Sequence, residues 1–304
     1  MKSKKKILLV LGAILILLIT CAILVGPKVR MAYHAAFATP VLTAAVGPSD
    51  YTSSSDGIEV HYIDVGDSDC TLIIADGHAM LIDGGNIGDT TARDYLEAHG
   101  IKKLDFMVGT HAHADHMGGL SDVLEAIEVE RVLASPYGTI LGVYKHLVRE
   151  VEKKGLHVEA PKVGDTFELG GATVTVMSPR ENYRLLNDTS LVLRIEYGEM
   201  SFLVEGDAQE DAEKGMIEDG LAKKVTVLRC GHHGSNNANS VEYLAILKPD
   251  YAVISCGENK YGHPHGRMLG RLEKIKTKKI YRTDQNGTIV AKSDGKTIEF
   301  TMAK

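Results

Sequence analysis

The sequence HAHADHMGG, residues 111–119, places three histidines and an aspartate within six positions. Such a segment suits neither a helix face nor a buried strand, because its polar side chains would point in several directions. Around two cations they can all be satisfied. On an extended stretch His111 and His113 reach one ion, and the turn that follows brings Asp115 and His116 to a neighbouring ion. Imidazole nitrogen and carboxylate oxygen suit zinc, manganese or iron(II) better than calcium.

Outward from this motif, short apolar runs alternate with amphipathic stretches, which indicates an α/β protein. The apolar runs predict strands at 58–65, 71–75, 79–82, 104–108, 132–134, 172–176, 190–197, 200–204, 225–229, 251–255, 280–281, 288–291 and 297–300. The amphipathic stretches predict helices near 90–98, 118–127, 140–154, 208–218, 241–247 and 268–275. The histidine motif follows directly after one of the predicted strands.

Several ordered motifs carry a family resemblance. The 111–119 motif resembles the HxHxDH signature of the metallo-β-lactamase superfamily, LIDGG at 81–85 is similar to the aspartate motif that precedes it, and Gly206-Asp207 is similar to the fourth motif. Further stretches resemble the hydrolase-like domain of the ComEC/Rec2 competence proteins: DVGDSDC at 64–70, NDTSLVLRI at 187–195, CGHHGS at 230–235 and SCGENKYGHPH at 255–265. The resemblance covers nearly all of 57–304 and implies an αββα metallo-β-lactamase sandwich with a two-metal site at one edge.

The resemblance also implies a ligand set of two divalent ions, zinc in the first place and manganese as the alternative. His111 and His113 would hold the first metal, Asp115 and His116 the second, and Asp207 would bridge the two. Either His232 or His233 would complete the second site. Asp83 would orient the ligand loop from behind.

Two departures from the family pattern affect this site. The usual DVGQGD reads DVGDSD at 64–69, and we assign Asp64 and Asp69 structural roles. No histidine stands in a suitable context for the third motif, where Asn187 or Asp188 takes the place. The first metal is therefore expected to have fewer protein ligands and an open position for water or substrate.

The metals imply a hydrolytic reaction, since two neighbouring cations lower the pKa of a shared water and neutralise charge on the intermediate. Asp115 and Asp207 would position the attacking hydroxide. His263, or the spare member of the pair His232 and His233, would act as general acid. Esters, amides and phosphodiesters all remain open as substrates of such a site.

Our main hypothesis for the substrate is an extracellular phosphodiester, with DNA as a candidate. A basic stretch beyond the site, which includes Arg267, Arg271 and Lys274, would contact phosphates. The same run is equally typical of a solvated helix face. The net charge of −6 does not attract nucleic acid through the bulk field. The alternatives are hydrolysis of another cell-envelope ester, such as phosphorylcholine or a lactone, and a non-catalytic metal-binding scaffold in DNA uptake.

The amino terminus predicts a membrane segment. Ile7–Gly26 is an uncharged, largely apolar run behind three lysines, which is long enough to span a bilayer with the lysines in the cytoplasm. We therefore expect an anchor at 1–26, a flexible linker at 27–56 and the hydrolase domain at 57–304 outside the membrane. A cleaved signal peptide and a secreted protein are the alternative. One span cannot form a channel, so transport would need a membrane channel or envelope partner, and the sequence leaves the oligomeric state open.

The cysteines predict no disulfide framework. Cys70, Cys230 and Cys256 are an odd number for an outward-facing domain, and apolar residues surround them. Inert buried thiols are the expectation.

Overall fold

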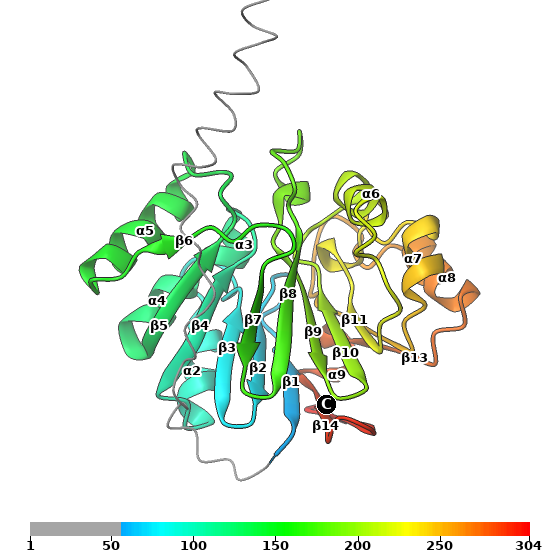
Figure 1. Cartoon of the computed structure of the whole chain (residues 1–304), viewed down its shortest axis with the longest axis horizontal. Coiled ribbons are helices and arrows are strands. Elements are labelled where there is room, and N and C mark those ends of the chain that lie inside the picture. Colours follow the sequence, from blue (N-terminus) through cyan, green and yellow to red (C-terminus); the bar gives the residue numbers. More distant parts are fainter. Residues whose placement is uncertain (1–55) are drawn as a thin grey trace, which may run out of the picture. The chain divides into compact units, whose positions relative to one another are not determined.

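The computed structural model describes residues 56–304, and these residues form two β-sheets packed face to face between two layers of helices (Figure 1). The predicted αββα sandwich is confirmed. Among residues 56–304, no helix combines the length and the apolar character that a membrane crossing requires. The predicted anchor and all but the last residue of the predicted linker lie outside the described residues.

The first sheet has the strand order β15-β14-β1-β2-β3-β4-β5-β6. Its middle strands are buried on both faces, as the uninterrupted apolar run TLIIA of β2 requires. Neighbours from β15 to β3 pair antiparallel, and neighbours from β3 to β6 pair parallel. The bounds are β1 (Ile58–Tyr62), β2 (Thr71–Ala75), β3 (His78–Ile82), β4 (Lys103–Gly109), β5 (Glu128–Ala134), β6 (Val158–Glu159), β14 (Ile289–Ser293) and β15 (Ile298–Met302).

The second sheet has the order β13-β12-β11-β10-β9-β8-β7. Strands β7 to β10 are an antiparallel meander, and β10 to β13 run parallel. The bounds are β7 (Thr166–Leu169), β8 (Ala172–Ser178), β9 (Val192–Tyr197), β10 (Met200–Val204), β11 (Val227–Arg229), β12 (Tyr251–Ile254) and β13 (Lys279–Arg282).

Helices cover the outer face of each sheet (Figure 1). Each presents an apolar stripe; in α5, for example, Tyr144, Leu147 and Val151 are buried at helical spacing. The first sheet carries α2 (Thr91–Ala98), α4 (Leu120–Ala126) and α5 (Gly142–Lys153), and the second α6 (Glu210–Glu218), α7 (Val241–Leu247) and α8 (Gly266–Lys274). The short helices α3 (Ala114–Met117) and α9 (Thr283–Asn286) lie in connections.

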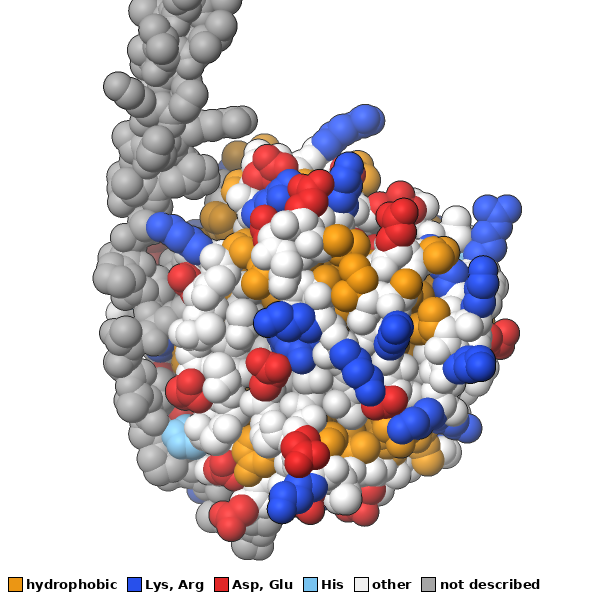
Figure 2. Space-filling view, turned by 45° about the vertical axis from the view of Figure 1, so that its right-hand side comes forward, with side chains coloured by type: hydrophobic (Ala, Val, Ile, Leu, Met, Phe, Trp, Pro, Cys, Tyr) orange, Lys and Arg blue, Asp and Glu red, His pale blue; other side chains and the backbone are white. Residues whose placement is uncertain are grey.

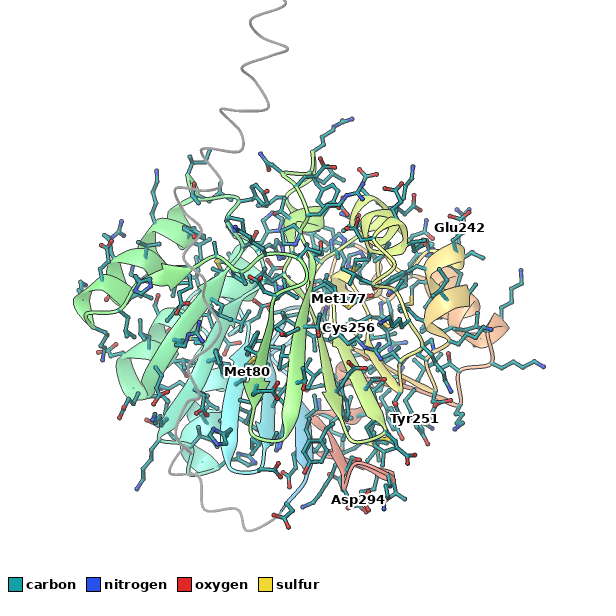
Figure 3. All side chains as sticks on the ribbon, viewed as in Figure 1. Met80, Met177, Glu242, Tyr251, Cys256 and Asp294 are labelled. Atoms are coloured by element: carbon teal, nitrogen blue, oxygen red, sulfur yellow. The ribbon has the colours of Figure 1, made fainter. Side chains whose placement is uncertain are left out.

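The core continues between the two sheets. Phe106 of β4 meets Phe167 of β7 with ring centroids 4.5 Å apart. Met80, Met177 and Cys256 lie inside the layers (Figure 3), and all three are buried. Cys70 and Cys230 are likewise buried, and within 56–304 all three cysteines are free thiols, so the prediction of buried, unpaired thiols is confirmed.

Several element boundaries differ from the sequence prediction. Strands β6 and β7 were not predicted, because β6 has only two residues and β7 alternates over only four. The strand expected at 190–197 begins at Val192, since Asn187–Thr189 forms a 3-10 turn. The first strand ends at Tyr62 and not at Val65. These shifts leave the order of the elements as predicted.

Candidate metal centre

The candidate ligands come from loops that follow strands of both sheets. The histidine motif begins two residues after β4 of the first sheet. Asp207 follows β10, and His232 and His233 follow β11, in the second sheet. The sandwich therefore brings residues almost 100 positions apart in sequence to one edge.

One group of atoms gathers around one oxygen of Asp207. Asp207 Oδ1 lies 3.1 Å from His116 Nε2 and 3.7 Å from His233 Nε2. Asp115 Oδ2 lies 3.5 Å from His233 Nε2 and 3.9 Å from His116 Nε2. We call this group the second position. Two imidazoles and two carboxylates thus converge there.

Another group of atoms gathers around the other oxygen of Asp207. Asp207 Oδ2 lies 3.6 Å from His111 Nε2 and 3.7 Å from His232 Nε2. His113 Nδ1 is 2.9 Å from His111 Nε2. We call this group the first position. Because each oxygen of Asp207 faces one group, this carboxylate is placed to bridge two cations.

The residues present fit a pair of divalent cations. His116 Nε2, His233 Nε2 and Asp207 Oδ1 are buried and make no hydrogen bond. Buried polar atoms in native proteins nearly always have a partner, and a cation would supply one to all three atoms. Nitrogen and carboxylate donors together suit zinc or manganese. His111, His113 and Asp207 form a separate set that could hold an ion at the first position.

The rings at the second position are oriented by hydrogen bonds on their far sides. His116 Nδ1 donates to Asp83 Oδ2 at 2.8 Å, and the same carboxylate accepts from the backbone and hydroxyl of Thr110. His233 Nδ1 donates to the carbonyl of Ser255 at 3.1 Å. Each bond fixes Nδ1 as the donor and leaves Nε2 directed at the centre. Asp83, which was predicted to orient the ligand loop, thus contacts His116 and Thr110.

Close backbone packing and an unusual turn hold the ligand loops. A Cβ atom added to Gly119 would lie 2.0 Å from the carbonyl oxygen of Gly84, so the paired glycines of the two motifs let their backbones touch. His232 and His233 both have positive φ, 49° and 52°, a region that non-glycine residues rarely adopt. The turn presents the two imidazoles to different oxygens of Asp207.

The buried charges shift the pKa values of the site in opposite directions. Burial alone would lower the pKa of His116, but the carboxylates of Asp207 and Asp83 outweigh it and hold this pKa well above its usual value. Burial would raise the pKa of Asp207, but His116 and His233 hold it well below its usual value. Burial and the neighbouring imidazole of His116 lower the pKa of His111. A neutral imidazole is the form that binds a cation.

Asn187 and Asp188, which were predicted as a pair, have separate surroundings. Asn187 Nδ2 donates to Asp207 Oδ2 at 3.1 Å and lies 3.2 Å from His232 Nε2. Asp188 instead accepts from the backbone nitrogens of Gln209 and Ala212 at the start of α6. The structure therefore brings Asn187 alone to the first position, and Asp188 serves the helix.

His263 lies beside the two adjacent histidines. Its ring centroid is 5.2 Å from that of His232 and 6.3 Å from that of His233. Tyr261, 64% exposed, stacks on it at 5.7 Å. The side-chain amide of Asn259 holds the loop: its Nδ2 donates to the carbonyl of His263, and its Oδ1 accepts from the backbone N–H of His263. Burial and the neighbouring His233 lower the pKa of His263.

The three predicted phosphate-contacting residues lie on α8 but do not share one environment. Arg267 and Lys274 are exposed, whereas Arg271 Nη2 donates to the carbonyl of Asn236 at 2.7 Å. Figure 2 shows the Lys and Arg side chains of the face that it presents interspersed with acidic ones. His265 caps α8 by accepting from the backbone nitrogen of Arg267.

Two site-adjacent residues received no site role from the sequence. Asp69 was given a structural role, and its carboxylate lies 3.5 Å from His116 Nδ1. Arg229, which was not singled out, forms an ion pair with Asp69. One sequence signal could have identified Arg229: it is a charged residue near the end of the mostly apolar run VTVLRC, 225–230, where solvent exposure is not expected.

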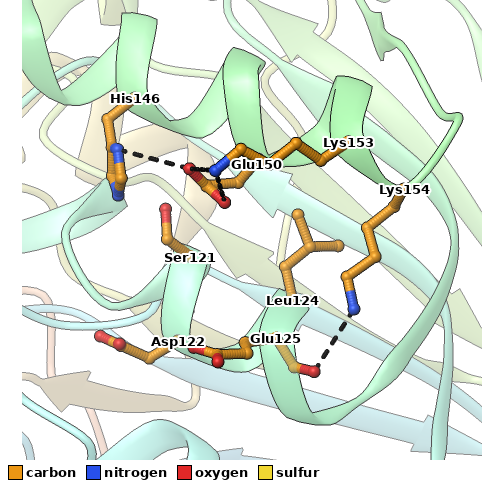
Figure 4. A pocket seen from close by; sticks show the side chains of 8 residues that line it. All are labelled: Ser121, Asp122, Leu124, Glu125, His146, Glu150, Lys153 and Lys154. Carbon is orange, nitrogen blue, oxygen red and sulfur yellow. Dashed lines mark hydrogen bonds and ion pairs between the residues drawn. The ribbon is translucent and has the colours of Figure 1, made fainter.

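A pocket of about 340 Å³ lies elsewhere, between α4 and α5 (Figure 4). Glu150 pairs there with Lys153 and lies 3.8 Å from His146. None of the candidate ligands contributes to this pocket. Its lining mixes both signs of charge and consists of Ser121, Asp122, Leu124, Glu125, His146, Glu150, Lys153 and Lys154.

Comparison with known families agrees with the fold. The profile of the Metallo-beta-lactamase superfamily matches residues 63–258, which is more than half of the chain. The chain therefore belongs to the metallo-β-lactamase superfamily, and the predicted family is confirmed.

Within the superfamily the chain is related to competence proteins. It is 32% identical to ComE operon protein 3 of Bacillus subtilis (strain 168) over 258 residues, which are 78% of this chain and 33% of that protein. It is 30% identical to Recombination protein 2 of Haemophilus influenzae over 230 residues, 72% of this chain and 27% of that protein. The chain thus spans about a third of the length of these relatives.

Solved structures share the fold at low identity. The metallo-β-lactamase fold protein YhfI of Bacillus subtilis has a TM-score of 0.55 and 11% identity, over 78% of this chain and all of its own. Igni18, a metallo hydrolase of Ignicoccus hospitalis, has a TM-score of 0.52 and 18% identity, over 76% of this chain and 98% of its own. CmlA, a diiron β-hydroxylase of Streptomyces venezuelae, has a TM-score of 0.52 and 17% identity, over 75% of this chain and 53% of its own. The fold alone thus admits more than one chemistry.

Proposed function

We propose that this protein is a dinuclear metal-dependent phosphodiesterase, anchored in the membrane with its hydrolase domain outside, and that DNA is its substrate. The placement of Asp207, with one oxygen toward each group of imidazoles, is the observation that carries the proposal. The kinship to competence proteins supports DNA over other diesters. The run at 7–26 supports the anchor.

The chain's own residues divide the work between ligands and proton carriers. His111, His113 and Asp207 would hold one cation. Asp115, His116, Asp207 and His233 would hold the other. Two such cations lower the pKa of a water molecule and neutralise charge on the phosphoryl group. The Asp115 carboxylate, partly exposed at the rim of the centre, accepts a hydrogen bond from the attacking water and orients it.

Of the two spare histidines, His263 is the better candidate to protonate the leaving oxygen. Burial lowers the pKa of His232 to about 4 and also lowers the pKa of His263, so the choice between them rests on position. His263 lies on the side of the centre where the exposed ring of Tyr261 stacks on it. A proton taken up there can be replaced from water after each turnover.

Hydrolysis assays test the proposal. The full chain is incubated with single-stranded DNA, double-stranded DNA and bis-p-nitrophenyl phosphate while zinc and manganese are titrated. We expect metal-dependent cleavage of DNA and of the small diester. Asp115→Ala with His116→Ala should lower kcat/KM by at least about 10³-fold, as expected when acid–base and cation contributions are lost together. Asp105→Asn, a buried change at the opposite end of β4, is the matched control.

Other outcomes would replace the proposal. Cleavage of the small diester but not of DNA would indicate that the substrate is an envelope diester, such as one carrying phosphorylcholine. Inactivity on all three substrates with two cations bound would indicate that the protein is a non-catalytic, metal-binding scaffold in DNA uptake that acts beside a membrane channel partner.

The placement outside the membrane has its own test. A protease added to intact cells should remove the hydrolase domain, 57–304, and leave a short membrane-bound fragment. Full protection of the domain would contradict this orientation, and release of the intact domain into the medium would indicate a cleaved signal peptide.

A further inference from the structure

Asp69 and Arg229 form a buried ion pair directly behind the metal centre. Asp69 lies in the loop between β1 and β2, and Arg229 is the last residue of β11. The exposed fractions of their side chains are 5% and 1%. Burial lowers the pKa of Arg229 to about 9, so the guanidinium keeps its charge at neutral pH. Two buried charges cost stability unless most of their hydrogen-bonding groups are satisfied, so the other contacts of the pair matter.

The carboxylate of Asp69 faces the rear of both imidazoles at the second position. It lies 3.5 Å from Nδ1 of His116 and 3.7 Å from Nδ1 of His233. Asp207 and Asp115, in contrast, face Nε2 of the same two rings. Both Nδ1 atoms already donate hydrogen bonds, to Asp83 and to the carbonyl of Ser255. By spacing alone Asp69 could join His116, Asp207 and His233 around an ion, since one ligand atom of each lies within 4.8 Å of the others. Its contacts with the two Nδ1 atoms, however, place it on the side of the rings away from Nε2.

Arg229 connects Asp69 to the backbone of the second sheet. Its Nη1 donates to the carbonyl of Gly206 at 2.7 Å, one residue before Asp207. Its Nε donates to the hydroxyl of Ser255 at 3.4 Å, and Ser255 is the residue whose carbonyl holds His233. Arg229 thus contacts the backbone next to Asp207 and the residue that holds His233. It is also paired with the carboxylate that lies behind His116 and His233.

We propose that Asp69 and Arg229 act as one positioning unit for the second position, and that neither binds a cation. Asp69 keeps negative charge against the donor sides of His116 and His233, and Arg229 fixes Asp69 relative to the Gly206–Asp207 backbone. Both are positioning residues, since they act through the ligands. The inference rests on the cation site and not on the identity of the substrate, so the absence of phosphodiesterase activity would leave it untouched.

Cobalt(II) binding tests this role without a hydrolysis assay. Cobalt(II) replaces zinc in such sites, and its visible absorption depends on the number and kind of its ligands. The full chain, its Asp69→Asn variant and its Arg229→Lys variant are stripped of metal and titrated with cobalt(II) by calorimetry and absorption. We expect two equivalents in all three proteins. One equivalent should bind about 10- to 100-fold more weakly in the variants, the usual loss when an outer partner of a ligand is removed, with an unchanged spectrum at saturation.

Two controls separate positioning from folding. Asp105→Asn also neutralises a buried carboxylate, one that accepts from the backbone of Ala79 and contacts His78, and it should match the parent in both equivalents. Thermal unfolding of the metal-free proteins shows how much stability each change removes. If Asp69→Asn does not fold, Arg229→Lys decides, because lysine keeps the buried positive charge but lacks the fork that reaches both Asp69 and Gly206.

Three results would overturn the inference. Binding of a single equivalent by Asp69→Asn, or a changed spectrum at saturation, would make Asp69 a ligand. Parent-like affinity in both folded variants, even with a lower Tm, would make the pair a feature of the core alone.

Discussion

Glu205 and Glu213 are two carboxyl groups buried behind the loop that carries His232 and His233. Glu205 accepts from the backbone of Gly231 and the side chain of Asn239, and Glu213 accepts from the backbone of Asn239 and Ser240. Burial, with the neighbouring Glu213, raises the pKa of Glu205 to about 8. Burial raises the pKa of Glu213 to about 7. Both groups are therefore largely protonated in the folded protein at pH 6.

These raised pKa values predict a stability that falls as pH rises. In the unfolded chain each carboxyl loses its proton near pH 4.5, so between about pH 5 and 8 the folded state binds more protons than the unfolded state. Glu205→Gln removes one of the two groups and keeps an oxygen for Gly231. The decrease in the free energy of unfolding between pH 5.5 and 8.5 should become smaller by roughly 1–3 kcal/mol.

Urea unfolding of the metal-free protein at the two pH values measures this difference. The matched control is Glu242→Gln, at an exposed position of α7 (Figure 3). A decrease of the same size in Glu205→Gln and in the parent would contradict the assignment.

At the residue scale, the sequence identified the side chains whose positions depend on short spacing. His111, His113, Asp115 and His116 lie within six residues, and their convergence follows from one strand end and one turn. The Asp69–Arg229 pair could not be predicted in this way, because its members are 160 residues apart and meet only when the two sheets pack.

The start of α6 offers a test that separates two adjacent residues. Asp188 accepts from two backbone N–H groups there, so Asp188→Ala should lower the free energy of unfolding by about 1–2 kcal/mol, as removal of a helix cap does. Asn187→Ala should instead lower kcat/KM, or the affinity of the first position, with little change in Tm, because Asn187 contacts Asp207 and His232. Chemical unfolding and cation titration of both variants check the contrast, and the same effects in both would refute it.

The exposed charges of α8 predict the salt dependence of DNA binding. Each phosphate contact contributes about 0.9 to the slope of log K against log salt concentration. If Arg267 and Lys274 contact the backbone, the double change to glutamine should make the slope shallower by about 1–2. Arg271 is left in place because it holds the carbonyl of Asn236.

Fluorescence anisotropy of a labelled oligonucleotide between 50 and 300 mM salt gives the slope. Changing Lys153 and Lys154 to glutamine, at the pocket of Figure 4, is the control of equal charge. Equal slopes in parent and α8 variant would exclude these two residues from the contact.

At the element scale, prediction was accurate where an element is long and periodic. The helix expected at 241–247 and the strand expected at 200–204 have those bounds. It failed at β6 and β7, since a two-residue or four-residue strand is defined by its neighbours in the sheet and not by its own pattern.

For the whole molecule, the origin of the ligands in both sheets couples cation binding to folding. His116 follows the first sheet, and Asp207 and His233 follow the second, so the unfolded chain has no such site. A cation at 100 times its Kd adds about 2.7 kcal/mol to the free energy of unfolding. Removal by a chelator should therefore lower Tm by roughly 5–10 °C.

Circular dichroism during heating measures this shift. The double change Asp115→Ala and His116→Ala should remove the part of the shift that comes from the second position and leave the part that comes from the first. An equal shift in that variant would mean that the chelated ion is bound elsewhere.

The αββα layers were predictable at this scale through the resemblance of the ordered motifs, because each motif stands at a strand end that the fold brings to one edge. The way the chain closes was not predictable. β14 returns from the second sheet to pair with β1, and nothing in the run TIVAKS at 288–293 names its partner.

This closure has a consequence for biosynthesis. Every backbone pairing between Ile58–Tyr62 and Ile289–Ser293 joins the start of the domain to its end. A ribosome that has made the first 280 residues therefore holds a chain whose earliest strand still has one open edge, and open edges recruit strands from other chains. The exposed edge of β1 is thus open to other chains until Ile289–Ser293 has been added.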